Sequence, residues 1–132
     1  MLQLLGVHHA IVVHGEGGLD ELTLSGDTSG WEVLDGAIRT WTLGIEESGL
    51  PRTPIDAIRG GTKEANAATM QRLFQGEPGP IRDVVLLNSG AALLAGDRVK
   101  TIRQGVESSA QIIDSGAALH KLEALVELSQ RL

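Results

Sequence analysis

The stretch "HHAIVVHGEGGLDEL", residues 8–22, combines a continuous apolar run with a glycine-rich turn and two adjacent carboxylates. The run at 10–13 is rich in β-branched residues and shows no alternation of polar and apolar side chains. A strand that is buried on both faces of a mostly parallel sheet has this pattern. The sequence therefore predicts a strand of such a sheet near 10–14, with the turn and the acidic pair at its carboxyl end.

The residues that follow predict an antiparallel meander over 21–42. Three short apolar segments are expected to be strands, at 21–24, 31–34 and 37–42. The last two are joined by Asp35-Gly36, a dipeptide that suits the positive φ angles of a tight hairpin turn. The meander would continue the sheet on one side of the first strand.

After Pro51 and Pro54 the spacing of the apolar residues becomes helical. Helices are expected near 54–58, 63–75, 80–95, 101–114 and 116–131. The small residues at 89–92 would permit close helix packing. The predicted fold class is α/β, in which the edge of a mostly parallel sheet carries a meander (21–42) and is covered by a C-terminal layer of helices (54–131).

Residues 1–5 resemble the last turn of a helix that Gly6 ends, because glycine commonly provides a left-handed helix cap. Two interpretations stay open. Met1 is an internal residue of a longer protein, or the chain has a short N-terminal helix of its own.

Composition excludes several classes of function. The 132 residues carry a net charge of −6 with scattered basic side chains, so binding to nucleic acid is not expected. No apolar run approaches the roughly 20 residues that a membrane-spanning helix requires, so no membrane partner is expected either. The chain has no cysteine, which rules out thiolate chemistry and makes the cytoplasm the expected location.

The adjacent carboxylates Asp20 and Glu21 are the first candidate for chemistry. Hard oxygen ligands suit Mg²⁺, which keeps several waters and takes one or two carboxylates plus substrate phosphates. The glycines at 15, 17 and 18 would let a ligand approach the backbone closely at the carboxyl end of a strand, where open α/β sheets bind ligands. A solvated loop edge behind an ordinary flexible turn is the competing interpretation.

Other polar residues are weaker candidates. His8 and His9 would point to opposite faces of a strand, which argues against a zinc site, and His14 would simply cap the strand. Asn66 and Asn88 interrupt apolar helix faces, so each is expected to hydrogen-bond a neighbouring backbone or side chain across a packed interface.

Four ordered segments of the chain together resemble the C-terminal part of anthranilate phosphoribosyltransferase. They are "VVHGEGGLDEL", "WTLGIEESGLP", "IRGGTKEANAATMQRLFQGEPGPIRDVVLLNSGAALLAG" and "IRQGVESSAQIIDSGAALHKLEAL". The most specific elements are His14-Gly15 with Leu19-Asp20-Glu21, Gly60-Gly61 with Asn66-Ala67, Leu86-Leu87-Asn88 and Ile113-Asp114-Ser115-Gly116. The resemblance covers nearly the whole chain.

This resemblance implies transfer of a phosphoribosyl group from phosphoribosyl pyrophosphate to the amine of anthranilate, in tryptophan biosynthesis, by a two-domain homodimer. Asp20 and Glu21 match the family's metal motif and would coordinate Mg²⁺ directly or through waters. The family's diphosphate-binding loop and its anthranilate-binding arginine belong to the N-terminal part. Residues 1–132 would then be the incomplete C-terminal segment of a phosphoribosyltransferase α/β domain, inactive alone.

Two alternatives remain open at this point. The chain could be a noncatalytic binding or assembly module of the same fold, in which a missing sheet neighbour leaves apolar surface exposed. It could also belong to a superfamily member with another acceptor. If the chain is a fragment with a severed sheet edge, its unpaired strand groups and uncovered apolar faces are expected to make it self-associate into a homo-oligomer.

Overall fold

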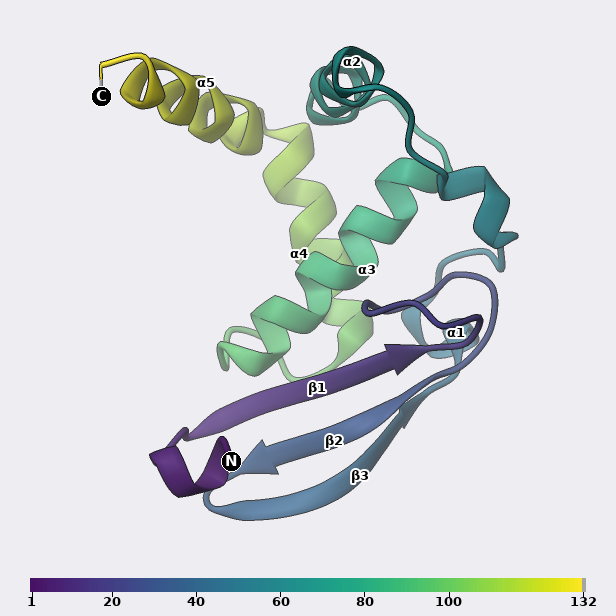
Figure 1. The fold of residues 1–132 in the computed structure, drawn as a ribbon, viewed down its shortest axis with the longest axis vertical. Helices are drawn as coiled ribbons and strands as arrows, with labels where there is room; N and C mark the ends of the chain where they lie inside the picture. Colours follow the sequence, from purple (N-terminus) through teal and green to yellow (C-terminus); the bar gives the residue numbers. More distant parts are fainter. Residues whose placement is uncertain (132) are drawn as a thin grey trace.

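The computed structural model describes residues 1–131 and places an antiparallel sheet beneath a layer of helices (Figure 1). The sheet has three strands in the order β1-β2-β3. The strands are β1 (His9–Gly15), β2 (Thr28–Leu34) and β3 (Ala37–Leu43). The helices are α1 (Ile45–Ser48), α2 (Lys63–Phe74), α3 (Pro80–Ala95), α4 (Ile102–Asp114) and α5 (Ala117–Ser129), with short 3-10 turns at Gln3–Leu5 and Ile55–Ile58.

The α/β class and the second hairpin of the meander are confirmed. Strands β2 and β3 pair from Thr28 opposite Leu43 to Leu34 opposite Ala37. The turn between them uses positive φ angles at Asp35 and Gly36, 49° and 76°. Of the predicted parallel sheet, the described residues contain only β1, which pairs antiparallel to β2. A parallel neighbour for β1 stays a prediction.

The predicted strand at 21–24 is wrong. Leu22 and Leu24 are buried as a strand would require, at 3% and 1% exposure. Their backbone groups, however, bond to partners outside any strand: the Leu22 peptide to Asn88, and the Leu24 carbonyl to the N–H of Thr53 at 2.9 Å. The apolar pattern at 21–24 therefore reflects burial in the core and not the hydrogen bonding of a strand.

One face of the sheet packs on the helices, and the other is open except around Val33, which is 5% exposed. Val13, Trp41 and Leu43 contribute to the core, whereas Val12 and Trp31, directly opposite each other on β1 and β2, are 45% and 54% exposed. The expectation that β1 is buried on both faces is therefore wrong for the residues described. Its central residues alternate between the two sides instead.

The four predicted helices from 63 onward are confirmed, each to within about two residues. Helix α1 was not predicted. Thr62 and Thr101 cap α2 and α4, each accepting a hydrogen bond from the backbone N–H three residues later. At the N-terminus, Gly6 ends the 3-10 turn with a φ of 73°, as predicted.

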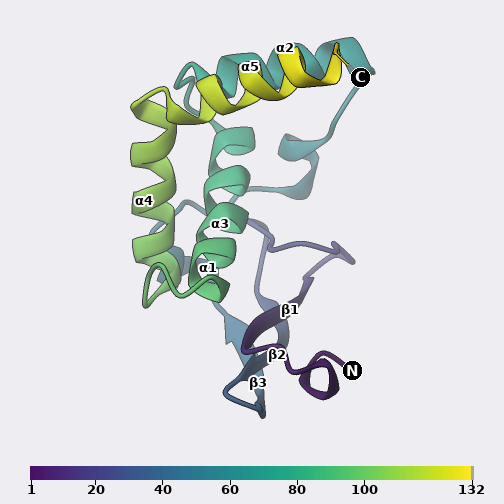
Figure 2. The ribbon, with the colours of Figure 1, turned by 90° about the vertical axis from the view of Figure 1, so that its left-hand side faces the viewer.

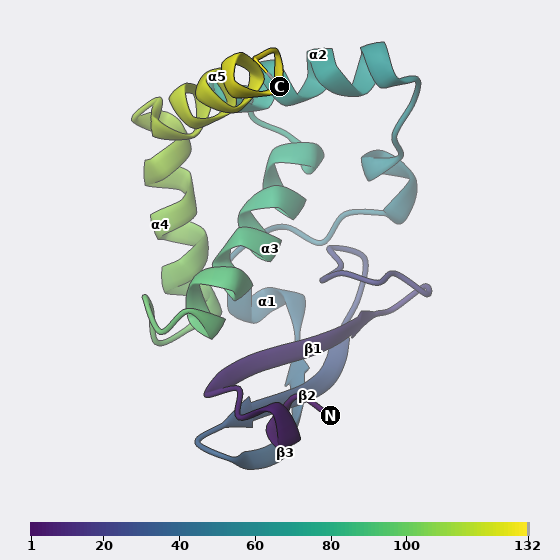
Figure 3. The same cartoon turned by 60° about the vertical axis from the view of Figure 1, so that its left-hand side comes forward.

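Helices α3 and α4 lie side by side above the sheet, and α2 and α5 cross the far end of the layer (Figures 2 and 3). The two helices approach each other closely at two glycines, Gly90 and Gly105. A Cβ on Gly105 would lie 2.5 Å from the Gly90 carbonyl oxygen and 2.6 Å from its Cα. The predicted close packing at the small residues 89–92 is thus confirmed at Gly90. Leu87, fully buried, lies one turn away on the same helix.

A chain of contacts between histidine rings and carboxylates joins the sheet to the loop between α3 and α4. His9 Nδ1 lies 2.8 Å from Asp97 Oδ1, and its Nε2 lies 3.2 Å from Glu32 Oε1. His8 contacts Asp35 at 3.0 Å and the other oxygen of Asp97 at 3.4 Å. Both histidines thus reach one carboxylate, so the expected divergence of their side chains is wrong.

The contact between His9 and Asp97 makes the free energy of unfolding depend on pH. The hydrogen bond from His9 holds the pKa of the Asp97 carboxyl below its usual range, burial opposes this, and the charges of His9, His8 and Lys100 add to the lowering. A lowered carboxyl pKa stabilises the fold above the ordinary value of about 3.9, and that stability is lost as pH falls through the folded-state pKa.

Asp97→Asn should therefore unfold at lower denaturant concentration than the unmodified chain at pH 7, and the gap should narrow below about pH 4. Asparagine tolerates the left-handed backbone found at this position (φ 55°), so the variant removes the charge and not the turn. Urea unfolding of both proteins from pH 7 to pH 3 measures the gap. If the two urea midpoints differ by the same amount at every pH, the charge of Asp97 is not the cause of the difference.

Candidate functional site

The loop after β1 is a hydrogen-bonded turn. The Gly15 N–H donates to the Leu19 carbonyl at 2.9 Å, and the Gly18 N–H donates to the Gly15 carbonyl at 3.2 Å. Gly17 and Gly18 adopt φ angles of 88° and 86°, which L side chains rarely adopt. At Gly15 a Cβ would meet the Glu21 carbonyl oxygen at 2.6 Å. The glycines therefore bring the acidic pair back against the end of β1.

Glu16 fastens the turn to the start of β2. Its backbone N–H donates to the Asp27 carbonyl at 3.0 Å, and its carboxylate accepts from the Asp27 N–H at 3.2 Å. A side chain at Gly26 would overlap this carboxylate, since its Cβ would lie 1.7 Å from Glu16 Oε2. The sequence alone does not single out Glu16, because a contact eleven residues away leaves no periodic signal.

Asn88 of α3 holds the other end of the acidic segment. Its Oδ1 accepts from the Leu22 N–H at 2.9 Å, and its Nδ2 donates to the Leu22 carbonyl at 3.2 Å. Nδ2 also lies 3.0 Å from the Val84 carbonyl oxygen of its own helix. The predicted hydrogen-bonding role of Asn88 is confirmed, and its target is the residue directly after Glu21.

Between these two anchors, the side chains of Asp20 and Glu21 are exposed. Within residues 1–131, neither carboxylate takes part in a hydrogen bond or ion pair. The only other adjacent acidic residues in the chain, Glu46 and Glu47, are already engaged. Glu46 pairs with Arg52 at 3.1 Å, and Glu47 accepts from the Gly44 N–H at 3.0 Å. Of the two acidic pairs, the one in the loop is available for a cation.

The donor set fits Mg²⁺ that is shared with a phosphate-bearing ligand. No group of three or more histidine or acidic side chains that could hold a metal occurs among the residues the structure describes. Two free carboxylates on an anchored loop would supply only part of an octahedral oxygen shell, and waters or phosphate oxygens would have to supply the rest. A metal held only by protein side chains would need more ligands than this loop offers.

Glu21 also lines a groove of about 600 Å³. The same groove is lined by the Gly60-Gly61 turn, which Asn66 holds by accepting from the Gly61 N–H at 2.8 Å and donating to the Gly61 carbonyl at 3.3 Å. The predicted hydrogen bonding of Asn66 to neighbouring backbone is confirmed, but Asn66 is exposed, so the expectation that it bonds across a packed interface is wrong. His14 is exposed at the end of β1, and no hydrogen-bond partner of its ring is found within residues 1–131.

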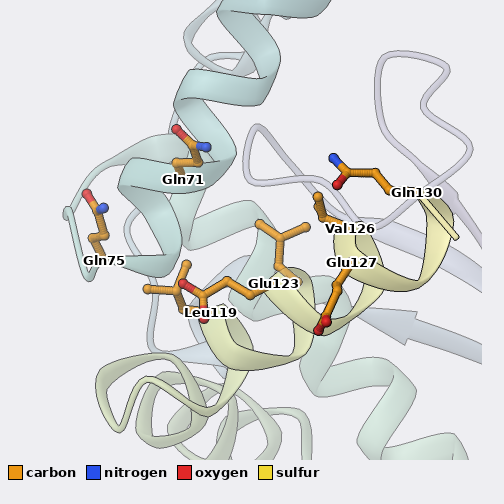
Figure 4. A pocket seen from close by; sticks show the side chains of 8 residues that line it. Gln71, Gln75, Leu119, Glu123, Val126, Glu127 and Gln130 are labelled. Carbon is orange, nitrogen blue, oxygen red and sulfur yellow. The ribbon is translucent and has the colours of Figure 1, made fainter.

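Two further hollows lie in the helical layer, away from the acidic pair. One, of about 450 Å³, separates α2 from α5 and is lined by Gln71, Gln75 and the Glu123 and Glu127 side chains (Figure 4). The other is an apolar groove of about 800 Å³ between α2, α3, α4 and α5.

Among residues 1–131, none of the helices combines the length and the apolar character that a membrane span would need.

Comparison with known proteins gives one consistent match. The description "Glycosyl transferase family, a/b domain" fits residues 1–119. The chain is 54% identical over 128 residues to the anthranilate phosphoribosyltransferase of Symbiobacterium thermophilum and 49% identical over 129 residues to that of Rhodopseudomonas palustris strain HaA2. These alignments cover 97% and 98% of this chain but 38% of each relative, so the chain spans under two fifths of their length.

Solved structures agree with the sequence comparison. The fold matches anthranilate phosphoribosyltransferase from Thermus thermophilus with a TM-score of 0.85 at 40% identity, over 96% of this chain and 37% of that one. A variant of the Saccharomyces cerevisiae enzyme with Mg bound matches with a TM-score of 0.82 at 25% identity, over 94% and 36%.

Proposed function

This chain belongs to the glycosyl transferase family with the a/b domain, and on that premise we propose that it is the C-terminal, Mg²⁺-binding part of an anthranilate phosphoribosyltransferase. The observation that carries the proposal is the free Asp20–Glu21 pair on a loop fixed at both ends. The relatives at 54% and 49% identity bear that enzyme's name, and a related structure contains Mg.

The proposed reaction moves a phosphoribosyl group from phosphoribosyl pyrophosphate to the amine of anthranilate. When bound, Mg²⁺ would neutralise negative charge on the departing pyrophosphate. Asp20 and Glu21 would hold the ion, and the turn at Gly15–Gly18 would keep these side chains in place during the transfer reaction. Because a preorganised loop needs little reorganisation, it can favour the charge distribution of the transition state.

The remaining parts of the proposal concern the whole protein. We infer that residues 1–132 are one segment of a longer α/β domain, that the full enzyme is a cytoplasmic homo-oligomer, and that this segment is inactive alone. The 38% coverage of the relatives and the pair of carboxylates on this loop support the incompleteness and inactivity of the segment. The exposed apolar side chains of the sheet support an oligomer, and the lack of cysteine supports the cytoplasm.

A metal titration tests the proposal on the chain itself. Mn²⁺ accepts the same oxygen ligands as Mg²⁺ and broadens nearby NMR signals. In the ¹⁵N-labelled chain, the amide signals of residues 16–22 should broaden first. The double variant Asp20→Asn/Glu21→Gln should abolish this selectivity, whereas Glu46→Gln should leave it unchanged. Broadening without preference for residues 16–22 would refute the metal role.

A noncatalytic assembly module is the second candidate, and the open sheet face favours it. Val12, Trp31 and Ile38 share that face and are 45%, 54% and 52% exposed. Exposed apolar clusters commonly mark contact surfaces. Light scattering distinguishes the two functions when combined with a binding assay. A defined oligomer without affinity for phosphoribosyl pyrophosphate, alone or with an N-terminal part, would support the module.

A further inference from the structure

We propose that Asn88 is a positioning residue for the acidic pair. Its side-chain amide raises the affinity of the loop for a divalent cation by holding the backbone N–H and carbonyl of Leu22 in place. The inference rests on the proposed function, because it concerns how tightly Asp20 and Glu21 hold a metal. Asn88 would not touch the ion, and it would act only through the backbone of the loop.

The contacts show how this positioning works. Both backbone groups of Leu22 bond to one amide, the N–H at 2.9 Å and the carbonyl at 3.2 Å. An adjacent strand would make the same two bonds, but residues 21–24 form no strand. Asn88 takes the place of that strand from a helix 66 residues further along the chain.

Asn88 is itself held in place. Its Nδ2 has a second acceptor, the Val84 carbonyl one turn earlier in α3, at 3.0 Å. Val84, Leu86 and Leu87 are buried, so the helix that presents the amide is anchored in the core. The position of Leu22 therefore depends on the packed helical layer and not on the loop alone.

The opposite end of the segment is fixed independently. The Gly15 N–H bonds the Leu19 carbonyl at 2.9 Å, so residues 20 and 21 lie between two restrained neighbours. Without the Asn88 contact, one of these restraints is lost, and the loop would have to be ordered when the metal binds. The conformational entropy lost in ordering the loop would lower its affinity for the metal. Removing partners that orient metal ligands typically weakens metal binding by about 10- to 100-fold.

Asn66 provides a matched control. It makes the same two bonds with the backbone N–H and carbonyl of one residue, Gly61, at 2.8 and 3.3 Å. The turn that it holds, at 60–61, carries no carboxylate. Asn66 lines the same groove as Glu21 but makes no hydrogen bond to residues 16–22, so replacing it removes a similar pair of hydrogen bonds from a different turn. A general loss of order and a specific loss of positioning can therefore be told apart.

The experiment is the Mn²⁺ titration of the ¹⁵N-labelled chain, applied to Asn88→Leu, Asn88→Asp and Asn66→Leu. Leucine leaves both Leu22 groups without a partner, while aspartate keeps one acceptor and loses both donated bonds. For the Asn88 variants, the Mn²⁺ concentration that half-broadens residues 16–22 should rise at least about tenfold. Asn66→Leu should keep the original concentration. Amide exchange at Leu22 should accelerate only in the Asn88 variants.

Each outcome decides the proposal. Unchanged Mn²⁺ midpoints in folded Asn88 variants would overturn the positioning role and leave the proposed function standing. A shift of equal size in Asn66→Leu would also overturn it, because loss of a hydrogen-bonded contact anywhere would then suffice. No selective broadening in the unmodified chain would refute the metal role of the acidic pair, and the inference with it. If Asn88→Leu does not fold, the more conservative Asn88→Asp decides.

Discussion

Gly105→Ala is expected to destabilise the chain by about 3 kcal/mol, the upper part of the usual range for overpacking. In an unconstrained helix this substitution stabilises by about 1 kcal/mol, so the predicted sign is the reverse of the ordinary one. The reason is the contact between α3 and α4, where the added Cβ would lie 2.5 Å from the Gly90 carbonyl oxygen. Backbone atoms of a packed helix cannot move aside as a flexible side chain can.

Thermal unfolding measures this effect, and a drop of about 10 °C in Tm is expected for a domain of this size. The control is Gly61→Ala, which adds the same methyl group where the nearest atom, the Ala65 Cβ, is 3.4 Å away. The control should stay near the original Tm. If both variants unfold at the same temperature, the close α3–α4 crossing does not exist in solution.

Asp20→Asn/Glu21→Gln is expected to lower phosphoribosyl transfer by a factor on the order of a hundred or more in an active complex. The amides keep the size of the side chains and remove both charges. The fold should be unchanged, because neither carboxylate has a partner within residues 1–131. Turnover with saturating Mg²⁺ in a complex with an N-terminal part measures the loss.

The matched control for that pair is Glu46→Gln/Glu47→Gln, the chain's other adjacent acidic residues. These side chains pair with Arg52 and cap the first helix, so their replacement should reduce stability and leave turnover per folded molecule unchanged. Full turnover in Asp20→Asn/Glu21→Gln would remove the metal role from these carboxylates.

The sequence predicted those features that depend on local patterns. The hairpin at Asp35-Gly36 and the helices from 63 onward follow from turn chemistry and apolar spacing. The acidic pair was also found, because adjacent carboxylates behind glycines stand out in a sequence. Its use as a metal site remains a proposal.

Long-range contacts decided the features that the sequence did not predict. Leu22 and Leu24 have a strand-like pattern, yet the Asn88 side chain, 66 residues away, replaces the expected strand ladder. His8 and His9 converge on Asp97, 88 residues from His9. Patterns within a short segment cannot reveal partners so far apart in the chain, so the contacts that anchor the site are seen only in the structure.

The most direct test of the account is the loss of anthranilate fluorescence that depends on both phosphoribosyl pyrophosphate and Mg²⁺. It should be measured with this chain alone, with the separately expressed N-terminal part of the Symbiobacterium thermophilum relative, and with their mixture. We predict turnover in the mixture only, since the chain would supply Asp20 and Glu21 to a shared site. A mixture that forms a stable complex and shows no turnover would contradict the account.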